Sequence, residues 1–296
     1  MKDKVYSQVY SLLKTSQEGL LDALKTFSRI GWDGIEAMGT NTGGLSKADF
    51  KKLLADLNLK IVSFHALRDE GDYAFAQEFG PKFTDIRMPH EATTRDAILA
   101  AAEGMNKQAE VIKKYGMKAV FHNHANEFFP ITDEKGTFCA YDLLLENTDP
   151  DLVGFEFDVG WGARAGVDVV GYIKKYAGRF PVLHVKECNK VGANQDEMEH
   201  FPQSILKLSA GADDEGRKVI KGAPRFTEEQ FRLLNESRSW NVELGKGLLD
   251  WNAIRDAAEA QGIVAYINER EYYDIPGANG DAAVCSEMDY KFLRAL

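Results

Sequence analysis

The sequence predicts a (β/α)8 barrel, because short apolar runs alternate with helical segments along almost the whole chain. Two of these runs are the most informative. Residues 153–161 and 180–187 are apolar and bounded by turn-forming residues, which indicates buried strands. The first carries Asp158 and the second carries His184. Because a buried ionisable group without a partner is costly, we expect these two groups to share an ion or to bind each other.

The first half of the chain supplies five of the expected strands. A helix is expected over 20–30, where apolar residues recur at helical spacing up to Gly31. Ser46 and Asp49 have capping-box spacing and predict that a second helix begins near Ser46. The alanine-rich stretch 93–115 predicts a long third helix. The expected strands, which are apolar runs between these segments, cover 5–13, 34–39, 60–65, 83–89 and 117–124.

The second half supplies three more strands and one irregular region. Strands are expected over 152–159, 181–186 and 264–269, with helices over 141–147, 169–176, 251–261 and 286–296. Between residues 186 and 251 the chain is longer than a loop requires. We interpret about 189–241 as an insertion after the seventh strand, with a helical segment at 226–234. Residues 1–296 are therefore predicted to form one barrel domain with an insertion.

The composition is that of an ordinary globular protein. The chain has 296 residues, 44% of them apolar and 28% charged, and a net charge of −10. This charge disfavours nonspecific binding to nucleic acid or to an anionic membrane. No stretch has the apolar length of a membrane span, and the N-terminus lacks the apolar core of a signal peptide. A cytoplasmic location and reduced cysteines are the expectation.

Candidate site residues gather where the expected strands end. Active sites of (β/α)8 barrels lie at the C-terminal ends of the strands. In this sequence those ends carry ionisable or aromatic side chains, whereas the opposite ends carry ordinary residues. The residues concerned are Glu36, His65, His122, His124, Asp158, Trp161, His184, Lys186, Glu269 and Glu271.

Five motifs in a fixed order resemble a known family. They are Gly31-Trp32-Asp33-Gly34-Ile35-Glu36, Phe121-His122-Asn123-His124-Ala125-Asn126-Glu127-Phe128, Gly154-Phe155-Glu156-Phe157-Asp158-Val159-Gly160-Trp161, Arg179-Phe180-Pro181-Val182-Leu183-His184-Val185-Lys186 and Glu243-Leu244-Gly245-Lys246-Gly247-Leu248-Leu249-Asp250-Trp251. Together they resemble the sugar phosphate isomerase/epimerase family of xylose isomerase-like TIM barrels. Its relatives include inosose dehydratase, ketose 3-epimerases and endonuclease IV.

The resemblance implies an enzyme with one divalent metal ion. It places metal ligands at Asp158, His184 and Glu269, and we favour Glu127 as the fourth ligand, with His124 as the alternative. An oxygen-rich site with one imidazole suits Mn²⁺, Mg²⁺, Co²⁺ or Zn²⁺. The strand-five residue His122 is expected to bind Glu156 by a hydrogen bond rather than to bind metal.

The same resemblance implies isomerisation or epimerisation of a sugar or sugar phosphate through an enediolate. Glu269 or Glu127 would act as the base, and Lys186 or His65 would donate a proton or hold a sugar oxygen. The remaining substrate contacts are assigned to His124, Trp161 and Glu36.

Other functions remain open at this point. The main alternative is a lyase that dehydrates an inosose or a 3-keto sugar through the same intermediate. A DNA-repair nuclease is disfavoured by the acidic charge and by only six histidines, and a noncatalytic sugar-binding barrel is the last alternative. A homodimer is a possible assembly. The Gly245-Lys246-Gly247 motif is interpreted as a backbone turn rather than a phosphate site.

Overall fold

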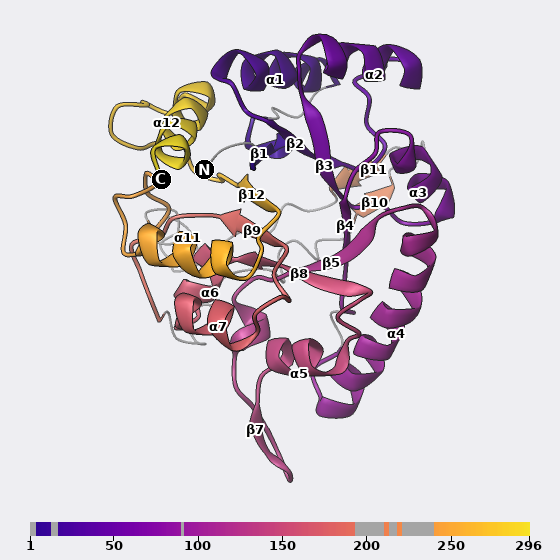
Figure 1. Ribbon diagram of the computed structural model, residues 1–296, viewed down its shortest axis with the longest axis vertical. Helices are drawn as coiled ribbons and strands as arrows, with labels where there is room; N and C mark the ends of the chain where they lie inside the picture. Colours follow the sequence, from indigo (N-terminus) through magenta and orange to yellow (C-terminus); the bar gives the residue numbers. More distant parts are fainter. Residues whose placement is uncertain (1–3, 13–16, 90–91, 193–209, 213–217, 221–239) are drawn as a thin grey trace.

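The computed structural model describes residues 4–12, 17–89, 92–192, 210–212, 218–220 and 240–296. Eight parallel strands form its centre: β1 (Val5–Gln8), β2 (Gly34–Met38), β3 (Lys60–His65), β4 (Phe83–Ile86), β5 (Lys118–His122), β8 (Val153–Asp158), β9 (Val182–Val185) and β12 (Ala265–Asn268). They close into a barrel in the order β1-β12-β9-β8-β5-β4-β3-β2 (Figure 1). The predicted (β/α)8 fold is therefore confirmed, and each strand overlaps an expected one.

Helices surround the barrel on its outside (Figure 1). They are α1 (Gln17–Ile30), α2 (Lys47–Asp56), α3 (Glu70–Gln77), α4 (Arg95–Lys114), α5 (Ala140–Asn147), α6 (Val159–Arg164), α7 (Val169–Lys175), α11 (Trp251–Ala260) and α12 (Ala282–Ala295). Neighbouring helices contact each other in the pairs α1 with α12, α4 with α5 and α7 with α11. Within the described ranges, no helix is long and apolar enough to cross a membrane.

The two ends of the barrel interior differ in chemistry. A buried apolar cluster lies inside the barrel and consists of Tyr6, Val62, Phe83, Val120, Val182, Ala265 and Ile267. Toward the C-terminal ends of the strands, the interior instead carries buried ionisable side chains such as Glu36, Glu156 and His184. The apolar layer closes one end of the barrel, and polar chemistry is confined to the other.

Local signals in the sequence explain where several elements begin. The Ser46 side chain accepts a hydrogen bond from the Asp49 amide, as the capping-box spacing predicts. Helix α12 begins four residues before the expected position, at Ala282, because Asp281 caps its first turn.

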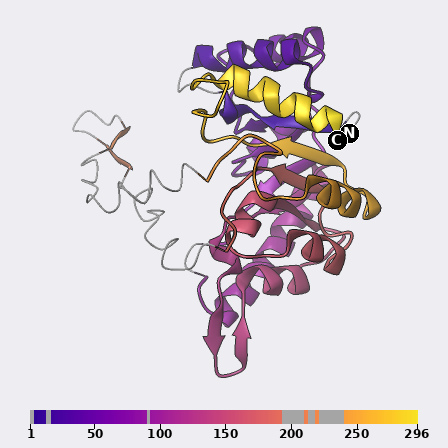
Figure 2. The same cartoon turned by 90° about the vertical axis from the view of Figure 1, so that its left-hand side faces the viewer.

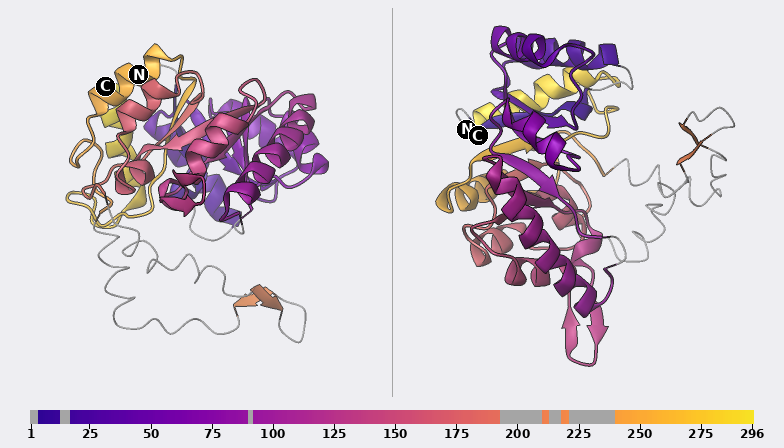
Figure 3. Two further views of the ribbon diagram at one scale, coloured as in Figure 1. Left: turned by 90° about the horizontal axis from the view of Figure 1, so that it is seen from below. Right: turned by 90° about the vertical axis from the view of Figure 1, so that its right-hand side faces the viewer.

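Two helices and a hairpin were not among the expected elements. Helix α3 follows β3, and helix α6 follows β8 directly. A hairpin of β6 (Ile131–Asp133) and β7 (Gly136–Phe138) projects from the barrel (Figures 2 and 3). Most of the predicted insertion at 189–241, including the expected helix at 226–234, lies outside the described residues. Within it, β10 (Ala210–Ala212) pairs antiparallel with β11 (Lys218–Ile220). The single-domain assignment stays a prediction.

Candidate metal and active site

Four ionisable side chains at the barrel mouth have the arrangement of metal ligands. They are His122 at the end of β5, Asp158 at the end of β8, His184 in β9 and Glu269 directly after β12. One potential ligand atom from each lies within 4.8 Å of the others. Each has a buried side-chain atom that contacts another ionisable group of the site rather than a backbone donor or acceptor. His122 Nδ1 lies 3.3 Å from Glu156 Oε2, Asp158 Oδ2 lies 3.5 Å from Lys186 Nζ, and His184 Nδ1 lies 3.5 Å from Glu269 Oε2. Buried carboxylates and imidazoles that gather so closely fit a bound cation.

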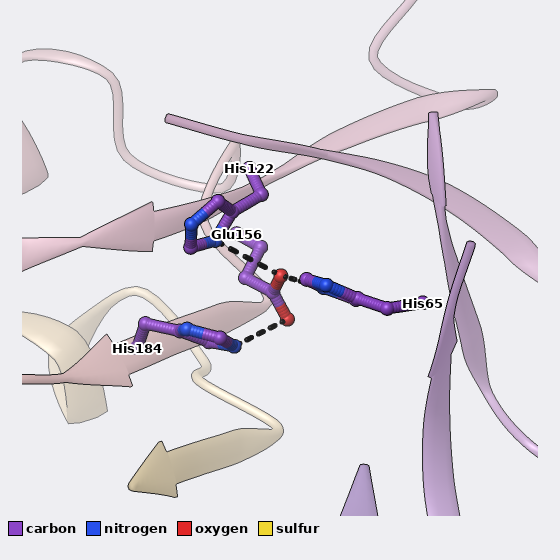
Figure 4. Close-up of side chains that lie close together, drawn as sticks. All are labelled: His65, His122, Glu156 and His184. Atoms are coloured by element: carbon purple, nitrogen blue, oxygen red, sulfur yellow. Dashed lines mark hydrogen bonds and ion pairs between the residues drawn. The ribbon is translucent and has the colours of Figure 1, made fainter. Parts of the chain in front are cut away.

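A second, deeper group converges on the carboxylate of Glu156 (Figure 4). His65 Nε2 lies 2.6 Å from Glu156 Oε2, and His122 Nδ1 lies 3.3 Å from the same oxygen. His184 Nε2 lies 3.3 Å from Glu156 Oε1 and 2.9 Å from Glu36 Oε2. His122 and His184 therefore belong to both groups, and the two nitrogens of His184 face opposite sides.

The imidazoles and carboxylates of the deeper group shift one another's pKa values. Burial alone lowers the pKa of His65, but Glu36 and Glu156 reverse this effect and raise the pKa to about 10. The pKa of His184 is likewise raised well above its usual value, against burial, by Glu156 and Glu36. Burial and the nearby His184 lower the pKa of His122 to about 3. His122 is therefore a neutral imidazole, which is the form that binds metal.

Lys186 places an ammonium group beside the carboxylates of the mouth. Its Nζ lies 2.7 Å from Glu269 Oε2, 3.1 Å from Glu271 Oε2 and 3.5 Å from Asp158 Oδ2. Burial alone lowers the pKa of Lys186, but these three carboxylates raise it above the usual value. Burial raises the pKa of Glu269, and Lys186 then brings it well below the ordinary range. Lys186 is thus held as a cation and Glu269 as an anion.

Asp158 is held in place from both sides. Its backbone amide donates to Asn123 Oδ1 at 3.0 Å, and its Oδ1 accepts from the Trp161 amide at 2.8 Å as the cap of α6. The Lys186 ammonium lies 4.9 Å from the centre of the Trp161 ring. The centres of the Trp161 and His124 rings are 5.7 Å apart. These contacts aim the second oxygen of Asp158 toward the mouth and leave Trp161 at its rim.

Glu127, the predicted fourth ligand, lies outside both groups. It belongs to a short 3-10 turn over Asn126–Phe128. Its carboxylate accepts hydrogen bonds from the His124 amide at 2.8 Å and from Asn126 Nδ2 at 3.0 Å. His124, the alternative ligand, is likewise not among the gathered ligand atoms. Glu36, predicted as a substrate contact, is completely buried below the mouth.

Several residues of the site escaped the sequence analysis. Glu156 was noted only as a partner of His122, although its position two residues before Asp158 places it on the same face of β8. Tyr10 donates to Glu271 Oε1 at 3.1 Å, and Gln8 donates to Glu36 Oε2 at 2.9 Å. Gln8 is the last residue of β1 and Tyr10 lies two residues beyond it, where the sequence shows no ionisable carboxylate or imidazole.

The Gly245-Lys246-Gly247 motif forms a turn against the end of β9. The Gly245 amide donates to Glu187 Oε2 at 2.9 Å, and Gly245 has the positive φ of 77° that favours glycine. Asp250 then caps α11 by accepting from the Ala253 amide at 3.0 Å. The geometry is that of the predicted backbone turn, with the amide engaged by a protein carboxylate.

The chain is similar to known proteins in sequence and in fold. No protein-family model matches the chain. An inosose dehydratase from Clostridium perfringens is 36% identical over 171 residues, which cover 58% of this chain and 52% of that enzyme. A similar enzyme from Mesomycoplasma hyopneumoniae is 30% identical over 205 residues, which cover 66% of this chain and 60% of the relative. The chain thus spans little more than half the length of the curated relatives that it matches.

Solved structures share the whole fold. A sugar phosphate isomerase/epimerase from Parabacteroides distasonis covers 100% of this chain and 95% of its own, with 21% identity and a TM-score of 0.70. An IolI protein with a bound zinc atom covers 99% of this chain and 97% of its own, with 14% identity and a TM-score of 0.65. At these identities the likeness establishes the fold. The resemblance to sugar phosphate isomerase/epimerases that the motifs predicted is therefore confirmed. The relatives are named as enzymes, and an enzyme is what the sequence predicted for this chain.

Proposed function

We propose that this xylose isomerase-like TIM barrel is a metal-dependent lyase that removes water from a polyhydroxylated ketone. The proposed substrate class is a keto cyclitol or keto sugar, in line with the inosose dehydratases among its relatives. The second candidate is epimerisation or isomerisation of such a ketone, which the names of its structural neighbours favour. Both reactions begin with loss of the proton next to the carbonyl group.

The observation that carries this proposal is the convergence of four buried potential ligand atoms within 4.8 Å of one another at the mouth. We assign the metal to His122, Asp158, His184 and Glu269, with His122 in the place first given to Glu127. Two imidazoles among four ligands favour a transition metal such as Zn²⁺, Mn²⁺ or Co²⁺ over Mg²⁺. The bound zinc of the IolI neighbour supports this assignment. When bound, the ion would polarise the ketone oxygen.

The side chains around Lys186 supply the proton transfers. Glu269, an anion, takes the proton next to the carbonyl, and Lys186, a cation, gives a proton to the departing β-hydroxyl group. The C–H and C–O bonds break, a C=C bond forms, and the products are one unsaturated ketone and one water. With Oε2 assigned to the metal, the other oxygen of Glu269 takes the proton and afterwards returns it to the neutral Lys186 amine, so both groups regain their starting charge after each turnover.

The rim residues hold the substrate in this proposal. Trp161 is buried beside Lys186, whose ammonium lies 4.9 Å from its ring centre, and His124 lies next to it; both are assigned as the walls of the substrate site. Glu127 anchors the loop that carries His124 through the 2.8 Å hydrogen bond to the His124 amide. His65 supports the carboxylates of the deeper group rather than contacting substrate.

Product analysis separates the two candidates. Metal-loaded protein is incubated with keto cyclitols and keto sugars in D₂O, and the products are followed by NMR. An unsaturated ketone supports the lyase, whereas a deuterated epimer or isomer without water loss replaces it with the second candidate. Glu269→Gln and chelated protein are expected to form neither product. Turnover by chelated protein at the rate of the loaded protein contradicts a metal-dependent reaction.

A further inference from the structure

We infer that Glu36 and Glu156 select the nitrogen through which His184 binds the metal. His184 is assigned to coordinate through Nδ1, while its Nε2–H is held by the two carboxylates. This inference rests on the proposed metal site and names the positioning residues beneath it. Neither carboxylate contacts the metal in this arrangement.

The ring of His184 lies between the two groups. Its Nε2 lies 2.9 Å from Glu36 Oε2 and 3.3 Å from Glu156 Oε1, both acceptors when ionised. Its Nδ1 is 3.5 Å from Glu269 Oε2 and forms no hydrogen bond with the described residues. A metal ion that binds Nδ1 displaces the proton from that nitrogen, and the imidazole keeps one proton, which the carboxylates accept at Nε2. The lone pair of Nδ1 is then left facing Asp158 and Glu269.

The two carboxylates are themselves fixed. Glu36 Oε2 accepts from Gln8 Nε2 at 2.9 Å, and His65 Nε2 lies 3.2 Å from Glu36 Oε1 and 2.6 Å from Glu156 Oε2. Both carboxylates are 0% exposed, so water does not compete for these contacts. The His65 ring stacks on His184 with 5.6 Å between ring centres and 6° between planes. The contacts with Glu36, Glu156 and His65 therefore fix the position, tilt and tautomer of the His184 ring.

This arrangement predicts a measurable contribution to metal binding. A carboxylate that accepts the second N–H of a metal-bound histidine fixes its orientation and raises its basicity. Loss of such a partner typically weakens metal binding about 10- to 100-fold. A competing arrangement places the ion in the deeper group itself, where His65, His122, Glu156 and His184 also bring ligand atoms within 4.8 Å. That arrangement would require His184 to bind through Nε2.

The experiment uses the full-length protein with ¹⁵N-labelled histidine, loaded with ¹¹³Cd²⁺. The coupling between the metal and the ring nitrogens identifies which nitrogen of His184 is bound, and a His184→Ala sample assigns the signal. Cadmium affinity is measured in parallel by competition with a chelator. The variants are Glu36→Gln and Glu156→Gln, with Asp142→Asn as the control, because Asp142 is a partly buried carboxylate that bonds Tyr172 and Tyr176 far from the mouth.

We expect coupling to Nδ1, about 10-fold or greater loss of affinity in at least Glu36→Gln, and wild-type affinity in Asp142→Asn. Coupling to Nε2, or unchanged affinity in both glutamine variants, overturns the inference while leaving a metal site in place. A wild-type protein that binds no cadmium, zinc or manganese overturns the proposed function and this inference with it. Circular dichroism of each metal-free variant shows whether a loss of affinity reflects loss of fold.

Discussion

Replacement of Glu187 by alanine is expected to lower the free energy of unfolding by about 4 kcal/mol. The side chain is only 3% exposed and adjoins Lys186 at the end of β9. Its carboxylate accepts four hydrogen bonds, three of which tie the 245–251 segment to the barrel. The donors are the amides of Cys188 (3.1 Å), Gly245 (2.9 Å) and Leu249 (3.4 Å) and the indole N–H of Trp251 (2.5 Å).

The magnitude follows from the donors left behind. Each buried donor that loses its acceptor costs roughly 1–3 kcal/mol. Burial raises the pKa of Glu187, which shows that the carboxylate is itself partly destabilised and keeps the total below the simple sum. Gly247 lies so close that a Cβ there would be 2.4 Å from Glu187 Oε1, and as a glycine it has no side chain that could replace the lost acceptor. Glu187→Gln keeps one oxygen acceptor and is expected to lose about half as much.

Urea denaturation followed by tryptophan fluorescence measures both variants. A loss of about 4 kcal/mol corresponds to a Tm lower by roughly 8 °C in a domain of this size. The glutamine variant serves as the matched control, since it preserves size and removes only the charge and one acceptor. A loss below about 1 kcal/mol in Glu187→Ala would refute the reasoning, because it would mean that the four donors find other partners.

Three further predictions concern the site and its support. Chelation is expected to lower Tm, and metal at about 100 times its Kd is expected to restore about 2.7 kcal/mol; identical melting curves contradict a metal site. Lys186→Met is expected to abolish turnover. The same variant is expected to bind metal more tightly, because the ammonium 2.7 Å from Glu269 repels a cation. Weaker metal binding by this variant in a chelator competition argues against a metal site beside Lys186. Arg270→Lys loses the paired hydrogen bonds to Asp289 (2.7 and 2.5 Å) and is expected to cost about 2 kcal/mol or more in urea denaturation; a neutral result refutes a stabilising role for this pair.

The barrel was predictable because its strands are apolar on both faces and stand out from the helices between them. Helix α6 was not, because its sequence Val159-Gly160-Trp161-Gly162 has low helix propensity. It forms where Asp158 caps it and where Gly160 permits close approach to Lys186, since a Cβ there would lie 2.6 Å from the Lys186 carbonyl oxygen. Tertiary contacts thus outweigh local preference in this segment.

The site was predictable at the strand ends and less so beyond them. Asp158, His184 and Glu269 lie together as the motifs indicated. For strand five, the alternation of side chains suggested that His122 and His124 point the same way. The strand ends at His122, so the alternation does not extend to His124. The sequence also offered no measure of how a turn over Asn126–Phe128 directs the carboxylate of Glu127.

The central claim is that His122, Asp158, His184 and Glu269 hold one divalent metal ion. Anomalous X-ray diffraction from crystals of zinc-loaded protein, recorded on both sides of the zinc absorption edge, tests it most directly. The account predicts one peak per chain, about 2.0–2.2 Å from one atom of each of these four side chains. A peak bound by Glu127 or His124 in place of His122, or no peak at the barrel mouth, would contradict it.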